Sequence, residues 1–503
     1  MKSNTWKGIV ALAVVAILVC SVPLFAQDTH YKLIDIGTLG GPVSYGSING
    51  GGDISGYRLL NNSGAVVSFA DTPFPDPNQA FGCYDLDCFQ AHAILWKKGA
   101  MTDLGTLPGN NNSAAGSINS HGWITGQSQS SVLDPNLGIP EVRAILWRHN
   151  QITDLGTLPG GTEALGVFVN DDDQVVVWSD NGIPDPFSFF YFTGTQMHTF
   201  LWDKGTKQDI GTLGGPDTIP GTDCGIAPPN LIVGGSYISF SPNAFTGIPT
   251  LDPFIWSHGV MTDLGTLGGT IGIAQCINRH GQIIGDSDLS GDANFHAFLW
   301  QDGAMADLGT LGGDNSHAAW LNEAGEAVGF ADLPDQTHHP VIWKSGEIKD
   351  LGTVANDPCG VALAVNARGQ VVGSTTDCQH YLHAFLWQDG GPMFDLNTLI
   401  PPGSGFQLTL ALNINDRGEI LAIVLPPGGD IFQDPDLYGH LVLLVPCGVK
   451  AGENCEPSLL PASSATVPLV RPTGRDNSNP HSKLYARPGL QKVGRRFGML
   501  LPK

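Results

Sequence analysis

Acidic side chains at alternate positions form one candidate for chemistry in this sequence. The seven residues from Asp286 read Asp-Ser-Asp-Leu-Ser-Gly-Asp, which puts oxygen ligands at alternate places and Gly at the sixth, as in calcium loops. Asp286, Asp288, Ser290 and Asp292 are therefore candidate Ca²⁺ ligands. A plain polar turn is the alternative, because Ala297 stands where an EF-hand loop carries Glu and no helices are expected beside it.

Histidines that recur through the chain suggest metal binding as a second chemistry. Five of them begin a short apolar run that ends each repeat: His92, His198, His296, His383 and His440. Metal ligands must converge within about 2 Å of one ion, whereas one histidine per repeat is spread along the chain. We therefore expect each to make a hydrogen bond within its own repeat, to a nearby Asp. The other histidines considered, His280, His338 and His339, are expected to be exposed.

Aromatic side chains gather in one insertion and suggest ligand binding by stacking. The run Phe-Ser-Phe-Phe-Tyr-Phe begins at Phe187 and is strongly apolar for a loop. Phe187, Phe189, Phe190 and Tyr191 are candidate ligand-binding residues, as a platform for a sugar or a protein partner. The alternative is an extended strand that packs on its own repeat.

Catalytic motifs are missing from the sequence. It contains no Gly-x-Ser-x-Gly, no His-Glu-x-x-His and no phosphate-binding P-loop. The 47 Asp and Glu residues are too many to single out a hydrolase pair. We nominate no catalytic residue and expect no cofactor other than calcium, so a non-catalytic protein is favoured while an enzyme stays open.

The cysteines indicate disulfides. One of the nine lies in the N-terminal apolar segment, and eight follow it: Cys83, Cys88, Cys224, Cys276, Cys359, Cys378, Cys447 and Cys455. An even number in an exported chain is typical of disulfide pairing. Closeness in sequence favours the pairs Cys83–Cys88, Cys359–Cys378 and Cys447–Cys455, which leaves Cys224–Cys276, although eight cysteines allow 105 pairings.

Internal repetition is the strongest signal in the chain. Asp-Leu-Gly-Thr-Leu-Gly-Gly, with drifting later copies, begins at Asp35, Asp103, Asp154, Asp209, Asp263, Asp307, Asp350 and Asp395. A second motif of Ile-Asn-x-x-Gly-x-Ile-Val-Gly type follows each copy, and a third, His-Ala-Phe-Leu-Trp, closes each unit. The fourth unit degrades the second motif to the sequence Ala-Pro-Pro-Asn from Ala227. The tightest copies are 43 to 45 residues apart, so the basic unit has about 44 residues.

Each unit is expected to contain four short strands and no helix. The aromatic third motif is typical of a buried strand, and Asn-x-x-Gly of a hairpin turn in which Gly has positive φ. A unit of this size with four strands has the dimensions of a propeller blade. The Gly-Thr-Leu-Gly-Gly segment is expected to pass from one blade to the next, with its Asp fixing the turn by bonds to backbone amides.

The two ends of the repeat region predict how it closes. The chain opens at Tyr31 with a sequence that matches the outer strand of a unit, and the pattern stops at Leu444 without one. The sequence therefore predicts an all-β, eight-bladed propeller of four-stranded blades in which the N-terminal strand completes the last blade. Seven blades and an open β-solenoid are the alternatives.

The repeats resemble those of the HAF repeat family, whose members are bacterial proteins expected to be extracellular. The resemblance rests on the combination of His-Ala-Phe-Leu-Trp with Asp-Leu-Gly-Thr-Leu-Gly-Gly over nearly all of residues 30–446. It implies a secreted or surface repeat protein without an established activity, and it supplies no catalytic residues. The fourth and eighth units depart from the pattern.

Composition and charge divide the chain into three parts. Residues 1–26 resemble a signal peptide, with Lys2 and Lys7 before an apolar core, and a retained membrane anchor is the alternative. Residues 27–446 form the repeat body. The basic, Pro- and Ser-rich tail 447–503 is expected to be mostly disordered. The chain carries a net charge of −23 although this tail is basic, so the body repels nucleic acid.

A secreted or periplasmic binding or scaffold module is the function that these features favour. Its expected partners are an extracellular glycan or protein, with no nucleic acid and no membrane after signal cleavage, and it is expected to be a monomer. The alternative is an extracellular propeller enzyme, such as a polysaccharide lyase or hydrolase. An enzyme should bring together polar residues unique to one or two units, whereas a binding module should present repeated or aromatic surface contacts.

Overall fold

The protein is all-β in a computed structural model that covers most of the repeat region. The described residues are 30–44, 58–77, 84, 88–135, 138–149, 151–188, 194–222, 224–228, 230–388, 390–425 and 439–447. The expected signal segment 1–26 and the tail beyond residue 447 lie outside them. Within them the helical structure is one 3₁₀ turn, η1 (Leu396–Thr398), and no helix is long and apolar enough to span a membrane.

The strands of the first four repeat units follow one another in chain order. Unit 1 contains β2 (Val66–Pro75), β3 (Phe89–Lys97) and β4 (Ala100–Asp103). Unit 2 contains β5 (Ser113–Ile118), β6 (Ile124–Leu133), β7 (Pro140–Arg148) and β8 (Gln151–Asp154). Unit 3 contains β9 (Ala164–Val169), β10 (Val175–Pro184), β11 (Thr195–Asp203) and β12 (Thr206–Asp209). Unit 4 contains β13 (Thr218–Pro220), β14 (Ile226–Ala227), β15 (Leu231–Pro242), β16 (Pro249–Ser257) and β17 (Val260–Asp263).

The last four units continue the same order. Unit 5 contains β18 (Gly268–Ile277), β19 (Ile283–Leu289), β20 (Phe295–Gln301) and β21 (Ala304–Asp307). Unit 6 contains β22 (Ser316–Leu321), β23 (Ala327–Asp332), β24 (His338–Lys344) and β25 (Glu347–Asp350). Unit 7 contains β26 (Cys359–Val365), β27 (Val371–Thr376), β28 (Tyr381–Trp387) and β29 (Met393–Asp395). Unit 8 contains β30 (Gln407–Ile414), β31 (Ile420–Leu425), β32 (His440–Pro446) and the N-terminal strand β1 (Tyr31–Asp35).

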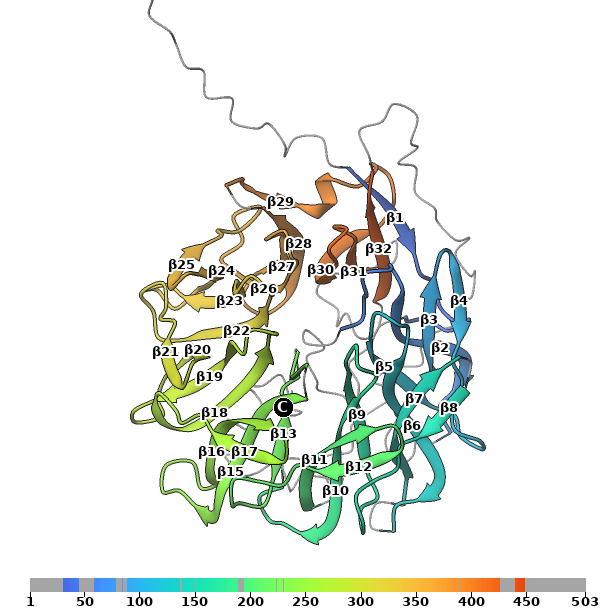
Figure 1. Ribbon diagram of the computed structural model, residues 1–503. Coiled ribbons are helices and arrows are strands. Elements are labelled where there is room, and N and C mark those ends of the chain that lie inside the picture. The colour runs from blue at the N-terminus through green and yellow to red at the C-terminus, as the bar shows by residue number, and fades with distance from the viewer. Residues whose placement is uncertain are drawn as a thin grey trace, which may run out of the picture.

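Antiparallel pairing of neighbouring strands builds each unit into a small sheet. Units 2, 3, 6, 7 and 8 are separate four-stranded sheets, and the described part of unit 1 has three strands. Units 4 and 5 are joined into one nine-stranded sheet by a single parallel pair, Leu251 with Ile271. The sheets are set around a common centre, with first strands such as β5, β9, β26 and β30 on the inside and β4, β8, β21 and β25 at the rim (Figure 1).

The predicted pairing of the N-terminal strand with the last unit is confirmed. β1 lies antiparallel to β32, from Tyr31 opposite Pro446 to Asp35 opposite Val442, and the two strands lie side by side in Figure 1. Tyr31 and Leu33 are fully buried in this pairing, and burial raises the pKa of the Tyr31 hydroxyl to about 12. The pairing covers the edge of β32 that would otherwise be unpaired.

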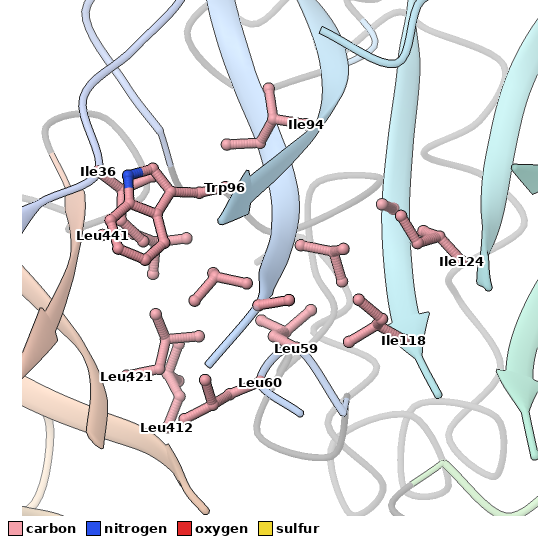
Figure 2. Close-up of a cluster of buried hydrophobic side chains, with 14 of the residues drawn as sticks. Ile36, Leu59, Leu60, Ile94, Trp96, Ile118, Ile124, Leu412, Leu421 and Leu441 are labelled. Carbon is pink, nitrogen blue, oxygen red and sulfur yellow. The ribbon is translucent and has the colours of Figure 1, made fainter. Parts of the chain in front are cut away.

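Apolar packing joins the last unit to the first. One cluster of buried side chains combines residues of units 8, 1 and 2 with Leu363 of unit 7. Figure 2 labels ten of the 14 that it draws: Ile36, Leu59, Leu60, Ile94, Trp96, Ile118, Ile124, Leu412, Leu421 and Leu441. The residue ranges of the remaining clusters connect each unit to the next, from unit 2 to unit 8. Burial of apolar surface between sheets is thus continuous from unit to unit.

The linker between units has the structure expected from its Asp and Gly residues. In all eight copies the Asp carboxylate accepts a hydrogen bond from the backbone N–H two residues on, at 2.6–2.9 Å. The second Gly of the Gly-Gly pair is needed for a close approach: a Cβ at Gly313 would overlap the carbonyl oxygen of Leu333. The motif therefore sets the passage between sheets.

Two of the expected disulfides are confirmed. Cys224 is bonded to Cys276 and Cys359 to Cys378. Cys88 and Cys447 are also disulfide-bonded, while their expected partners, Cys83 and Cys455, lie outside the described residues.

Candidate functional site

A ring of asparagines joins the units at the end of the molecule that carries the Asn-x-x-Gly turns. The side-chain amide of each donates to the backbone carbonyl of the Asn in the next unit, at 2.9–3.1 Å. These bonds run from Asn61 to Asn119, Asn119 to Asn170, Asn278 to Asn322, Asn322 to Asn366, Asn366 to Asn415, and Asn415 back to Asn61. The last bond links unit 8 to unit 1.

Unit 4 interrupts this ring. It has Ala227 and Pro228 where the other units carry the motif. The amide of Asn170 keeps its bond to Gln174 Oε1 at 2.9 Å, as Asn278 does to Gln282, but among the described residues it makes no bond to the next unit. The gap is spanned by the Cys224–Cys276 disulfide, which connects unit 4 to the first strand of unit 5. A covalent bond thus stands where a hydrogen bond joins the other units.

A cavity of about 440 Å³ lies beside the asparagine ring. Its wall includes backbone and side chains of the Asn motifs together with five charged residues: Arg58, Asp171, Arg279, Glu323 and Asp416. These five come from different units, and four of them occupy the position directly after the motif Asn. We call this cavity the channel mouth.

The guanidinium groups of the channel mouth are only loosely held. Arg279 is 62% exposed and lies 3.9 Å from Asp171 Oδ2 and 3.7 Å from Glu323 Oε1. Burial alone would raise the pKa of Asp171, but the Ser120 N–H and the positive charge of Arg58 outweigh it and lower that pKa. The mouth therefore offers guanidinium donors beside ionised carboxylates, which suits a polar ligand with acceptor and hydroxyl groups.

The opposite end of the units carries long hairpins with exposed apolar tips. The second strands of units 1 to 4 have 10 to 12 residues, against 6 or 7 in units 5 to 8. Near their ends the exposed fractions are 62% for Phe74, 59% for Leu133, 53% for Ile183 and 60% for Phe240. We call these four tips and their neighbours the hairpin face. It is the face of the long insertions, where the sequence predicts a ligand and where Phe74 stands out as an aromatic residue.

A buried carboxyl cluster supports this hairpin face between units 2 and 3. Glu163 is only 4% exposed and its Oε2 accepts the Val142 N–H at 2.8 Å. Burial, with the charges of Asp134, Asp180 and Glu141 close by, raises the pKa of Glu163 to about 9. The equivalent residues Asn112 and Asn315 accept the same backbone bond with an amide oxygen.

The repeat histidines form hydrogen bonds within their units, as expected for three of them. His92, His198 and His296 place Nδ1 2.8–2.9 Å from Asp103, Asp209 and Asp307. His383 bonds to another nearby Asp, Asp357, at 2.7 Å, and His440 Nδ1 is 3.7 Å from Asp35.

The expectation for His339 is wrong. Its side chain is 21% exposed and pairs with Asp350 at 2.9 Å, so it is the repeat histidine of unit 6. His338 is half-buried against Phe330, whereas His280 is 66% exposed as expected.

The segment predicted to bind calcium is partly strand rather than loop. Asp286 and Asp288 lie inside β19 and are buried, while Ser290 and Asp292 follow in the turn. Asp286 bonds to His317 Nδ1 at 2.6 Å, and Asp292 accepts from the Thr270 N–H at 2.6 Å. No three His, Cys, Asp or Glu side chains in the described part of the chain form a metal-binding group, and calcium at this segment stays a prediction.

The aromatic insertion is described only at its start. Phe187 lies in a turn, not a strand, and packs against the apolar cluster of units 3 and 4. Its carbonyl accepts from the Tyr237 hydroxyl at 3.3 Å. Phe189, Phe190 and Tyr191 lie outside the described residues, so their role in binding stays a prediction.

Comparison with known proteins gives weak structural likenesses. No protein-family model and no curated protein matches the chain. Among solved structures, the acylaminoacyl peptidase of Pyrococcus horikoshii is similar at 10% identity and a TM-score of 0.41, over 74% of this chain and 57% of that one. The chain thus spans little more than half of that peptidase.

Two further likenesses involve smaller proteins. The β-propeller domain of the trilobed protease of Pyrococcus furiosus, reported with an open velcro topology, has 12% identity and a TM-score of 0.40, over 68% of this chain and 96% of that one. The Aleuria aurantia lectin AAL, in complex with Fucα1-6GlcNAc, has 11% identity and a TM-score of 0.26, over 57% of this chain and 96% of that one. None of these likenesses assigns an activity to the chain.

Proposed function

We propose that the eight units are the blades of one propeller, closed by β1, in an exported protein of the HAF repeat family. The pairing of β1 with β32 supports closure, as does the bond from Asn415 in unit 8 to Asn61 in unit 1. The disulfides fit an oxidising compartment outside the cytoplasm. Eight sheet units, rather than seven, follow from counting unit 4 and unit 5 separately within their joined sheet.

The function that we propose is a binding module that holds a partner protein on the hairpin face. The observation that carries it is the exposure of Phe74, Leu133, Ile183 and Phe240 near the ends of four consecutive hairpins. Exposed apolar side chains gathered on one face are typical of protein interaction sites. Phe245, which follows the hairpin of unit 4, is 75% exposed and extends this face.

A partner protein fits this face better than a nucleic acid or a charged polymer does. The residues at the tips are apolar or carry hydroxyl and amide groups, as in Ser130, Ser131, Asn181 and Ser239. Apolar tips from four hairpins form a surface that a second protein can desolvate, with the hydroxyl groups as a polar rim.

The channel mouth supports a second candidate function, binding or conversion of a small polar molecule such as a sugar. Arg58, Asp171, Arg279 and Glu323 come from separate units and meet at one cavity of about 440 Å³. Polar groups of this kind converging at one cavity are what an enzyme or a small-ligand binder requires. This candidate predicts that Arg279→Ala abolishes binding or turnover while hairpin variants leave it unchanged.

Site-specific photocrosslinking tests the proposed function. A photoreactive residue at Leu133 or Phe240 of the full chain, exposed to the source cell's own surface and secreted proteins, should give a discrete crosslinked product. Val260 provides a matched control, because it is 63% exposed but begins β17 beside the turn at the opposite end of unit 4. Loss of the product in a variant with Ser at Phe74, Leu133 and Phe240, at unchanged melting temperature, supports the proposal. Equal products from Val260, or none from the tips, overturn it.

A further inference from the structure

One position of the repeat holds a basic side chain in every unit but the fourth. It lies on the third strand of each unit, or on the strand that takes its place, and the aspartate of the linker motif lies on the neighbouring strand. Its occupants are His92, Arg143, His198, Asp252, His296, His339, His383 and His440. The register confirms the equivalence: Asp252 pairs with Ser236 as His198 pairs with Ser179.

In other units the histidine at this position bridges two oxygen groups. His198 Nδ1 is 2.9 Å from Asp209, and its Nε2 is 3.2 Å from the carbonyl oxygen of Pro216 in the following linker. His440 likewise places Nε2 2.9 Å from the Pro42 carbonyl. The imidazole therefore stands between a carboxylate and a linker carbonyl, both of which are acceptors.

Unit 4 places a second carboxylate where these imidazoles stand. Asp252 is only 8% exposed, and its Oδ1 is buried without a hydrogen-bond partner in the described part of the chain. Its neighbour Asp263 keeps the usual linker bond, accepting the Gly265 N–H at 2.7 Å. Burial raises the pKa of Asp252 to about 7, and the negative charge of Asp263 and the hydrogen bond with it act in the same direction.

Two neighbouring carboxylates with one buried oxygen unsatisfied destabilise the folded protein when both are ionised, and either a proton or a cation can offset this repulsion. Burying a carboxylate without compensation costs several kcal/mol. One shared proton neutralises one of the two charges, whereas a divalent cation neutralises both. The Asp in place of His also leaves the linker carbonyl equivalent to those of Pro216 and Pro42, that of Thr270, without an imidazole donor.

We propose that Asp252 and Asp263 bind a hard divalent cation of the Ca²⁺ class, which occupies the place of the repeat imidazole in unit 4. The Thr270 carbonyl is the third protein ligand by its position in the repeat, and water completes the oxygen shell that Ca²⁺ requires. This site adjoins the segment of Asp286 to Asp292, because Asp292 accepts the Thr270 N–H at 2.6 Å, but none of its three proposed ligands belongs to that segment. With two carboxylates, its Kd is expected on the order of 10⁻⁴ to 10⁻³ M, as in other extracellular calcium modules.

Calcium titration of the full, oxidised chain tests this site, with thermal unfolding as a second readout. Wild type should bind Ca²⁺ and melt at a higher temperature in Ca²⁺ than in chelator. Asp252→His restores the residue of the other units, so it should lose at least tenfold in Ca²⁺ affinity while melting in chelator no lower than wild type. Glu347→Gln, which removes an exposed carboxylate far from the candidate calcium ligands in the sequence, is the control and should leave binding unchanged.

The same experiment distinguishes the cation from a shared proton. A wild type that responds to pH but neither binds nor is stabilised by Ca²⁺ overturns the proposal, and so does an Asp252→His protein that keeps the full response. Should Asp252→His fail to fold, Asp252→Asn keeps the size of the side chain, and Tb³⁺ luminescence of that variant must be at least tenfold weaker than that of wild type at equal Tb³⁺. Equal luminescence refutes the site.

Discussion

Replacing Glu163 by Gln tests how the buried carboxyl cluster affects stability. Glu163 is 4% exposed, accepts the Val142 N–H through Oε2, and has its pKa raised to about 9 by burial and by neighbouring carboxylates. In the equivalent place Asn315 accepts from Phe295 and donates its amide to Asp332 at 2.9 Å. A protonated Glu163 can both accept and donate a hydrogen bond, as the Asn315 amide does. Gln at this position has the same donor and acceptor at every pH.

The sign and size of the effect follow from proton linkage. The ordinary pKa of Glu is 4.5, so between pH 4.5 and 9 the folded state holds a proton that the unfolded chain has released. This contribution is fully present below pH 4.5 and is lost as the pH rises toward 9. The free energy of unfolding should fall by about 1.4 kcal/mol per pH unit, or about 3 kcal/mol from pH 5.5 to 7.5, as an upper limit.

Urea unfolding of wild type and Glu163→Gln at pH 5.5, 6.5 and 7.5 measures this difference. Asp252, with a pKa raised to about 7, gives a slope of the same sign in both proteins, and subtraction removes it. Asp180, whose pKa is also raised by burial, lies in the cluster of Glu163, so the difference reports Glu163 together with its coupling to Asp180. The advantage of the variant should grow with pH, while Glu347→Gln at an exposed position should run parallel to wild type. Parallel profiles for Glu163→Gln would refute the reasoning.

Two further predictions concern the links between units. Asn322→Ala removes the bond to the Asn366 carbonyl and leaves buried backbone groups unpaired, so the free energy of unfolding should fall by about 3 kcal/mol in urea titrations, against a negligible change for Ser120→Ala. Leu33→Ala in the closing strand β1 should lower the free energy of unfolding by about 3 kcal/mol in the same assay and speed the hydrogen exchange of β32 amides. Lys32→Ala on that strand should do neither. Equal effects of the two variants would contradict closure by β1.

Much of the fold could be predicted because the residues that form each turn and strand lie close together in the sequence and recur in every unit. The bond from Asp103 to the Gly105 N–H involves residues two apart, so the same few letters give the same turn in every copy. The role of Tyr31 as the start of a closing strand followed from its likeness to the outer strands. Because the same turn and strand motifs recur in eight units, the sequence predicts eight similar sheets in succession without knowledge of any long-range contact.

Errors arose where a residue's role depends on another unit or on irregular sequence. His339 was missed as a repeat histidine because Pro340 and Val341 replace Ala-Phe after it, although it pairs with Asp350 like the others. Asp286 was placed in a loop because its acidic pattern suggested calcium, but β19 continues through it and His317 of the next unit binds it. Spacing along one segment cannot reveal a partner supplied by its neighbour.

The candidate sites were hidden for the opposite reason, because they lie where the repeats differ. Arg279, Glu323 and Asp416 occupy one repeat position with different chemistry, so no pattern marks them. The signal that could have found them is this variation itself, at a fixed place directly after an invariant Asn. Phe74 stands out in the sequence as an aromatic residue of an insertion, whereas no motif marks Phe240 at the tip of its hairpin.

Unit 4 shows how such variation is accommodated in a ring that depends on repeated links. Loss of the motif Asn in unit 4 removes two links, to units 3 and 5, and the Cys224–Cys276 disulfide joins units 4 and 5 at the same place. Cys224 and Ala227 line the channel mouth, so the segment of unit 4 that departs from the repeat motif forms part of the cavity wall. Because a disulfide constrains the unfolded chain as well as joining the folded one, it stabilises the ring without needing side-chain amides there. The residue after each Asn nevertheless serves both purposes: the Asp171 and Glu323 carboxylates line the cavity and also accept the backbone N–H groups of Ser120 and Arg279 in neighbouring units.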